Sequence, residues 1–312
     1  MKKLFFTLSI LLIFLFPFLF QENKTLNPSF YHWDNTYSLQ NPSEKLYIKV
    51  LDIAFSNKLE VIKTKFITKE PSDYIPTIYI TNEAMKKTSN IKLLKAISKN
   101  LKSLKFNEIQ IDCDWSLSTK AKYFELLKQI KTTFKTSLSS TIRLHQIKYA
   151  NKTGIPPVDY GVLMYYNMST ITNINTKNSI LDNEVAKKYH YNFDTYPLKL
   201  KLALPLYSQG VQFRENKALD IFEGIQEKDF KDNFKAIGNN KYQVLQSTYF
   251  KGRYVYKDDI LRFEDSTYED IQIALSDFLK LSKNSFDEII FYTYKYKKKY
   301  DLDKLLKETK WF

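Results

Sequence analysis

Two carboxylates, Asp112 and Asp114, lie two residues apart at the end of an apolar run that extends from Ile109 to Ser116. Side chains two apart on a strand point the same way, so both carboxylates, with Ser116, are expected on one face. Carboxyl groups so placed can perform acid–base chemistry, and in parallel barrels the polar residues at the carboxyl ends of strands build the active site. We therefore predict Asp112 and Asp114 as catalytic candidates. The plainer interpretation is a strand end with two solvated acids.

Basic side chains are expected to face the same interior. Strand alternation points Arg143 and His145 into a barrel from one strand and Lys49 from another. A buried Lys or Arg needs a partner, so we expect Lys49 or Arg143 to pair with Asp112. Such a pair would lower the pKa of the Asp112 carboxyl and leave Asp114, nearer the mouth, as the better catalytic candidate.

A metal site would have to combine His32 and His145, from two different strand ends, with Asp112 or Asp114. No His-x-His or His-x-x-x-His spacing supports one, and His145 fits a structural role equally well. Cys113 is the only cysteine, which excludes an intramolecular disulfide and favours a buried structural thiol. We predict no metal and no other cofactor.

The elements that must position these residues alternate between strand and helix. Amphipathic helical patterns are clearest at 90–104, 118–136 and 179–189, and such alternation predicts a parallel sheet. No glycine-rich turn follows the first strand, so eight strands favour a (β/α)8 TIM barrel over a doubly wound sheet. A long stretch from about 208 to 268 is predicted to be a hairpin-containing insertion before the helix at 267–282. The predicted strands are 28–34, 45–53, 75–82, 108–115, 139–146, 160–167, 199–207 and 286–294.

Composition limits the class of protein. The 312 residues are 44% hydrophobic, enough for one large core, and the net charge is +14. Only four of the 48 basic residues are arginines and the lysines are scattered, so we predict no nucleic-acid partner. The one dense basic run, Lys295 to Tyr300, would suit an anionic wall polymer or a membrane surface, or a solvated segment at the entry of a helix.

The first 23 residues resemble an export segment. Lys2 and Lys3 precede an apolar stretch from Leu4 to Phe20, which predicts export to the periplasm, the outside, or the outer face of the inner membrane. No small-x-small cleavage pattern follows, so a cleaved signal and an uncleaved anchor both remain open. The remainder, residues 24–312, is predicted to be a single domain.

The order of the strand-end motifs resembles glycoside hydrolases of family 18, the chitinase group. That family carries Asp-x-x-Asp-x-Asp-x-Glu on its fourth strand and Met-x-Tyr-Asp on its sixth. Asp112 and Asp114 match the second and third Asp of the first motif, and 164–167 (Met-Tyr-Tyr-Asn) is similar to the second. The segment 203–207 (Ala-Leu-Pro-Leu-Tyr) resembles the family's seventh strand. The chain as a whole is most similar to a group of exported bacterial barrels that are themselves glycoside-hydrolase-like.

Three departures from the family pattern bear on activity. Ser116 stands where the family's general-acid Glu belongs, Ile109 replaces the first Asp, and Asn167 replaces the Asp after the tyrosine. In the family, the Glu protonates the leaving oxygen while the substrate's acetamido group attacks. A serine hydroxyl is far too weak a proton donor to replace that acid, so we expect no ordinary chitinase chemistry.

The resemblance implies an exported protein that acts on a polysaccharide or cell-envelope glycan. If it is an enzyme, we expect a glycosidase with Asp114 as acid or base, and a second carboxylate from a loop or from Glu264. The alternative is a catalytically inactive glycan-binding or envelope-assembly protein on the same fold. The residues expected to contact the sugar are Trp33, Arg143, His145, Tyr166, Asn167 and Tyr207.

Overall fold

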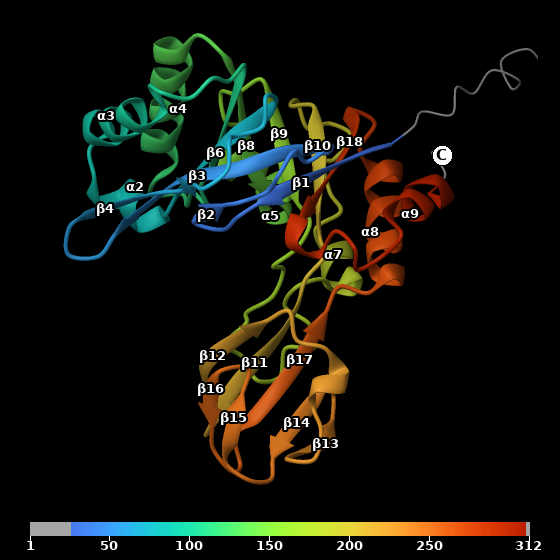
Figure 1. The fold of residues 1–312 in the computed structure, drawn as a ribbon. Coiled ribbons are helices and arrows are strands. Elements are labelled where there is room, and N and C mark those ends of the chain that lie inside the picture. Colours follow the sequence, from blue (N-terminus) through green and yellow to red (C-terminus); the bar gives the residue numbers. More distant parts are fainter. Residues whose placement is uncertain (1–25, 310–312) are drawn as a thin grey trace, which may run out of the picture.

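The computed structural model describes residues 26–309, and its centre is a closed barrel of eight parallel strands (Figure 1). The first strand of the barrel pairs with both the second and the last strand of the barrel, which closes the sheet. The (β/α)8 barrel predicted from the sequence is confirmed. In chain order the barrel strands are β1 (Asn27–His32), β3 (Lys45–Phe55), β6 (Tyr74–Ile80), β7 (Glu108–Asp112), β8 (Ser137–Arg143), β9 (Tyr160–Met164), β10 (Leu200–Pro205) and β18 (Ser285–Tyr292).

Helices lie outside the barrel, and the longer ones bury one apolar face. In α3, for example, Leu93, Ile97 and Leu101 recur at a spacing of four and are buried, as expected for an amphipathic surface helix. The helices are α2 (Asn82–Lys87), α3 (Asn90–Leu101), α4 (Lys120–Phe134), α5 (Leu144–Lys148), α6 (Ala150–Thr153), α7 (Asn183–Lys187), α8 (Tyr268–Leu281) and α9 (Leu302–Glu308). No helix within residues 26–309 is long and apolar enough to cross a membrane. The predicted export segment, residues 1–23, lies outside the described residues.

The core has two layers, which follow the alternation of the strands. Aliphatic side chains fill the space between strands and helices, and Cys113 is buried there, as predicted. The barrel interior is more aromatic, with Tyr31, Tyr47 and Tyr160 among its buried residues. Below the mouth, Lys201 pairs with Glu288 at 2.9 Å, so the interior ion pair satisfies the lysine's buried charge.

Between β10 and α8 the chain builds a separate antiparallel sheet, drawn below the barrel in Figure 1. Its strand order is β12-β11-β17-β14-β13, and it has an apolar core of its own that includes Phe222, Val244 and Leu261. Within the insertion, β14 pairs with β17 whereas β15 pairs with β16, so residues 241–250 contribute to two different sheets. The strands are β11 (Ser208–Arg214), β12 (Lys217–Glu223), β13 (Phe234–Gly238), β14 (Lys241–Val244), β15 (Thr248–Phe250), β16 (Arg253–Val255) and β17 (Ile260–Asp265).

Some predicted elements are shorter than the sequence suggested. The helix expected at 179–189 is only α7, which begins where the Asp182 side chain accepts hydrogen bonds from the backbone N–H groups of Glu184 and Val185. Two barrel strands end early, β7 at Asp112 and β8 at Arg143, and this changes where the site residues point. The short strands β2 (Thr36–Tyr37) and β5 (Lys65–Phe66) pair with each other, and β4 (Leu59–Lys63) forms a hairpin with β3.

Candidate active site

A cavity of about 500 Å³ opens at the carboxyl ends of the barrel strands. The barrel supplies most of its wall and the insertion supplies the rest, through β11, β12 and the residues near them. Its lining residues are Trp33, Tyr79, Asp112, Asp114, Arg143, Met164, Tyr166, Asn167, Ser169, Ile171, Ser179, Tyr207, Gln209, Ile221, Glu223 and Tyr292.

Asp112 is the last residue of β7 and lines this cavity. It is 8% exposed, and its Oδ1 accepts a hydrogen bond from Thr141 Oγ1 at 2.6 Å. Burial, together with the neighbouring negative charge of Asp114, raises the pKa of Asp112 to about 6. A carboxyl with such a pKa carries its proton in weakly acidic solution and can donate it.

The prediction that Lys49 or Arg143 pairs with Asp112 is wrong. Arg143 instead pairs with Asp114, its Nε and Nη2 donating to the two carboxylate oxygens at 2.7 Å each. Lys49 is buried as predicted, but its partner is Asp52 at 3.4 Å. The predicted lowering of the pKa of Asp112 is therefore also wrong.

Asp114 is consequently the more constrained of the two acids. Its side chain is 52% exposed, and the two-pronged bond to Arg143 engages both of its carboxylate oxygens. Arg143 also approaches the carbonyl oxygen of Tyr166, with Nη1 at 3.4 Å. Asp114 thus fixes the Arg143 guanidinium at the cavity wall, and the raised pKa of Asp112 makes that carboxyl a candidate proton donor.

Aromatic rings form much of the cavity wall, and Tyr292 joins them. Its ring centroid lies 5.9 Å from Trp33, 5.5 Å from Tyr166 and 5.7 Å from Tyr207. Tyr79 adds a further ring, 6.1 Å from Trp33. Tyr292 was not among the predicted site residues, although its place near the end of the last predicted strand could have identified it as one.

Tyr207 and Asn167 are joined by a hydrogen bond. The Tyr207 hydroxyl donates to Asn167 Oδ1 at 2.6 Å, and both residues line the cavity. The backbone of Asn167 has φ of 55°, a left-handed conformation that asparagine tolerates better than most residues. The side chain that replaces the family's Asp therefore positions a phenol at the cavity wall.

Three predicted positions lie elsewhere. His145 is exposed on α5, because β8 ends at Arg143 and the strand alternation stops there. Ser116 lies beyond the end of β7, hydrogen bonded to Ser118 and Thr119, and does not line the cavity. His32 packs on Tyr37 with ring centroids 5.1 Å apart.

The histidines and acids therefore do not assemble a metal site. Among residues 26–309 no group of three or more His, Cys, Asp or Glu side chains could hold a metal ion.

Glu264 is not an accessible second carboxylate. It is fully buried in the insertion and pairs with Arg262 at 2.7 Å, and it accepts hydrogen bonds from Ser179 and Gln209. The insertion instead contributes Glu223, the last residue of β12, to the cavity wall. No sequence pattern pointed to Glu223, because only the folding of the insertion against the barrel brings it there.

No protein-family model matches the chain, and no curated protein matches its sequence. Solved structures do match. The chitinase from Chromobacterium violaceum is 10% identical with a TM-score of 0.54, and the match covers 91% of this chain and 98% of that one. The spore cortex-lytic enzyme SleL from Bacillus cereus is 12% identical with a TM-score of 0.53, covering 90% and 73%.

The C-terminal domain of a chitinase-like protein from Desulfitobacterium hafniense is 9% identical with a TM-score of 0.51, covering 91% of this chain and 99% of that one. At these identities the matches establish the fold. The structural comparison thus confirms a distant resemblance to the chitinase group of glycoside hydrolases, on a shared (β/α)8 barrel.

Proposed function

We propose that this protein binds and hydrolyses a polysaccharide or cell-envelope glycan in the cavity at the carboxyl ends of its barrel strands. The observation that carries the proposal is Asp112, a buried carboxyl with a pKa of about 6 that lines a cavity walled by aromatic rings. The structural neighbours, a chitinase and a spore cortex-lytic enzyme by their names, support a glycan as ligand.

The side chains of the cavity suit a sugar. Aromatic rings bury the apolar faces of sugar rings, and Trp33, Tyr79 and Tyr292 are available for this. Arg143 and the Tyr207–Asn167 pair offer polar groups for sugar hydroxyls. In this arrangement Asp112 protonates the leaving oxygen, and Asp114 acts indirectly by holding Arg143.

The alternative function is glycan binding without hydrolysis. Two observations favour it: Ser116 supplies no acid, and the ion pair with Arg143 occupies both carboxylate oxygens of Asp114.

We also propose that the protein is exported through residues 1–23, with the basic end inside. Cell fractionation of the full chain, with and without this segment, tests export.

The test of function is a glycan screen on the full chain, following binding and reducing-end release together. Probes are chitin oligosaccharides and solubilised peptidoglycan. The key variant is Asp112→Asn, and the matched control is Asp287→Asn, which makes the same change at an exposed position on β18.

Release that disappears in Asp112→Asn and persists in the control supports a hydrolase. Binding without release by the unaltered protein supports the binding alternative, and neither binding nor release refutes the proposed function.

A further inference from the structure

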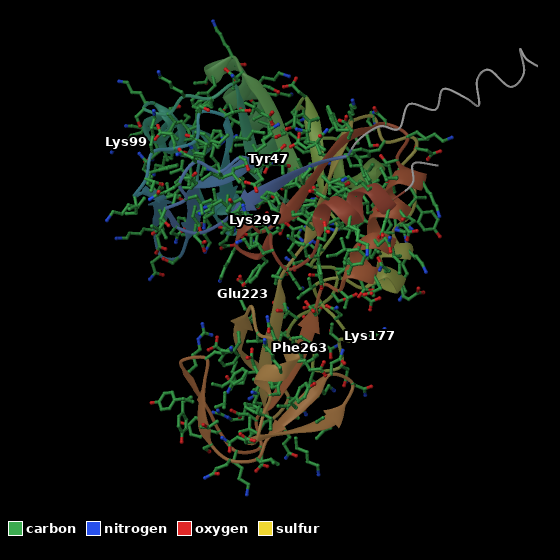
Figure 2. The ribbon with its side chains drawn as sticks, turned by 45° about the vertical axis from the view of Figure 1, so that its right-hand side comes forward. Tyr47, Lys99, Lys177, Glu223, Phe263 and Lys297 are labelled. Carbon is green, nitrogen blue, oxygen red and sulfur yellow. The ribbon has the colours of Figure 1, made fainter. Side chains whose placement is uncertain are left out.

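Glu223 is a third carboxylate at the cavity that Asp112 and Asp114 also line. It ends β12, and Figure 2 shows it at the junction between the barrel and the insertion. Its side chain is 47% exposed, so it is open to solvent and to a ligand, unlike the buried Glu264.

The loop that follows β18 fixes Glu223 in place. The Tyr296 hydroxyl donates to Glu223 Oε1 at 2.7 Å, and Lys295 Nζ lies 3.8 Å from the same oxygen. The next residue, Gly224, has φ of +74°, and a Cβ there would lie 2.6 Å from the Tyr296 hydroxyl oxygen. Only glycine lets Tyr296 approach so closely, so the contact that orients Glu223 depends on residue 224 being glycine.

The strand order puts this loop across the barrel from Asp112. Between β7 and β18 lie β8, β9 and β10 on one side and β6, β3 and β1 on the other, so the two strands are diametrically opposed. Glu223 therefore faces Asp112 across the cavity. Tyr292 lines the same cavity, and burial first, then the charge of Glu223 and more weakly that of Asp112, holds the pKa of Tyr292 well above its usual value.

We propose that Glu223 is the general base of the site and that hydrolysis proceeds with inversion at the anomeric carbon. This inference rests on the proposed function. Inverting glycosidases place their two carboxyl groups far enough apart for a water molecule to enter between them, as carboxyl groups on opposite walls of a cavity allow, whereas retaining enzymes need the two groups close together.

Hydrolysis of the glycosidic bond is then a single displacement at the anomeric carbon. The Asp112 carboxyl gives its proton to the glycosidic oxygen as the bond from that oxygen to the anomeric carbon breaks. The Glu223 carboxylate takes a proton from water as the water oxygen bonds to the opposite face of the same carbon. Both carboxyl groups then exchange protons with solvent and regain their starting forms.

The experiment compares the full chain with Glu223→Gln and with Glu215→Gln, the same change in the exposed turn between β11 and β12. Proton NMR of fresh digests of a chitin hexasaccharide and of solubilised peptidoglycan reads the anomer released first, and isothermal titration reads binding. We expect the inverted anomer, about 100-fold or greater loss of turnover in Glu223→Gln with unchanged affinity, and normal turnover in Glu215→Gln. Azide should restore part of the turnover of Glu223→Ala, because this small nucleophile needs no base to activate it. If Glu223 only held the shape of the site, azide would not restore turnover.

The outcomes separate the two proposals. A retained anomer, or a Glu223→Gln variant that keeps its turnover, overturns the role of Glu223 and leaves the glycosidase intact. Binding without release by the unaltered protein also overturns that role and favours the binding alternative. Failure of both binding and release overturns the proposed function itself.

Discussion

Replacing Asp112 with asparagine should stabilise the protein at neutral pH. The pKa of Asp112 is raised from 3.8 to about 6, so the folded state holds this proton more tightly than the unfolded chain does. The folded protein therefore loses stability as pH rises from about 4 to about 6, and the loss persists above that range. At roughly 1.4 kcal/mol per pH unit, the ionised carboxylate costs about 3 kcal/mol.

Asparagine removes this cost because it does not ionise, while its side-chain oxygen can still accept the hydrogen bond from Thr141. We expect Asp112→Asn to be more stable than the unaltered protein by up to about 3 kcal/mol at pH 7.5 and nearly equal to it at pH 4. Urea unfolding followed by tryptophan fluorescence at both pH values measures the free energy of unfolding.

The control is Asp114→Asn, which should have the opposite sign at pH 7.5. It weakens the two-pronged bond to Arg143, whose side chain is only 23% exposed, and we expect a loss of about 1–2 kcal/mol after allowing for the exposure of Asp114. A gain for Asp112→Asn that is the same at pH 4 and 7.5, or a loss at pH 7.5, would refute the reasoning about the charge at Asp112.

Three further outcomes follow from named contacts. If Asp112 is the acid, the hydrolysis rate on a chitin hexasaccharide should fall about tenfold per pH unit above pH 6, and a rate that is flat to pH 8 contradicts this. Gly224→Ala should lower the unfolding free energy by about 1–3 kcal/mol in urea, because its Cβ meets Tyr296; an unchanged midpoint would show that Tyr296 moves away without cost. Lys201→Met should cost about 3 kcal/mol by leaving Glu288 buried beside fewer partners, and adding Glu288→Gln should recover part of that loss; if the double variant is worse than the single one, the pair is not the cause.

The sequence predicted the barrel because the signal for it is local. All eight barrel strands lie within a few residues of their predicted positions, since each is a short apolar run of strand length. The strand-end residues Asp112, Tyr166 and Tyr207 line the cavity for the same reason. Alternation misplaced His145, because the rule applies only while the chain remains extended, and here a helix begins at Leu144.

The composition, the strand pattern and the run ending in Asp112 and Asp114 were sufficient to predict the fold class and to bring Asp112 and Asp114 to one cavity at the end of the barrel. Only the tertiary structure decided which charges meet. Arg143 pairs with Asp114 rather than Asp112, and Glu223 reaches the cavity from an insertion whose sheet packs beside the barrel mouth. Such contacts depend on sheet register, on where each strand stops and on how distant segments fold together, and side-chain spacing along one segment carries no information about them.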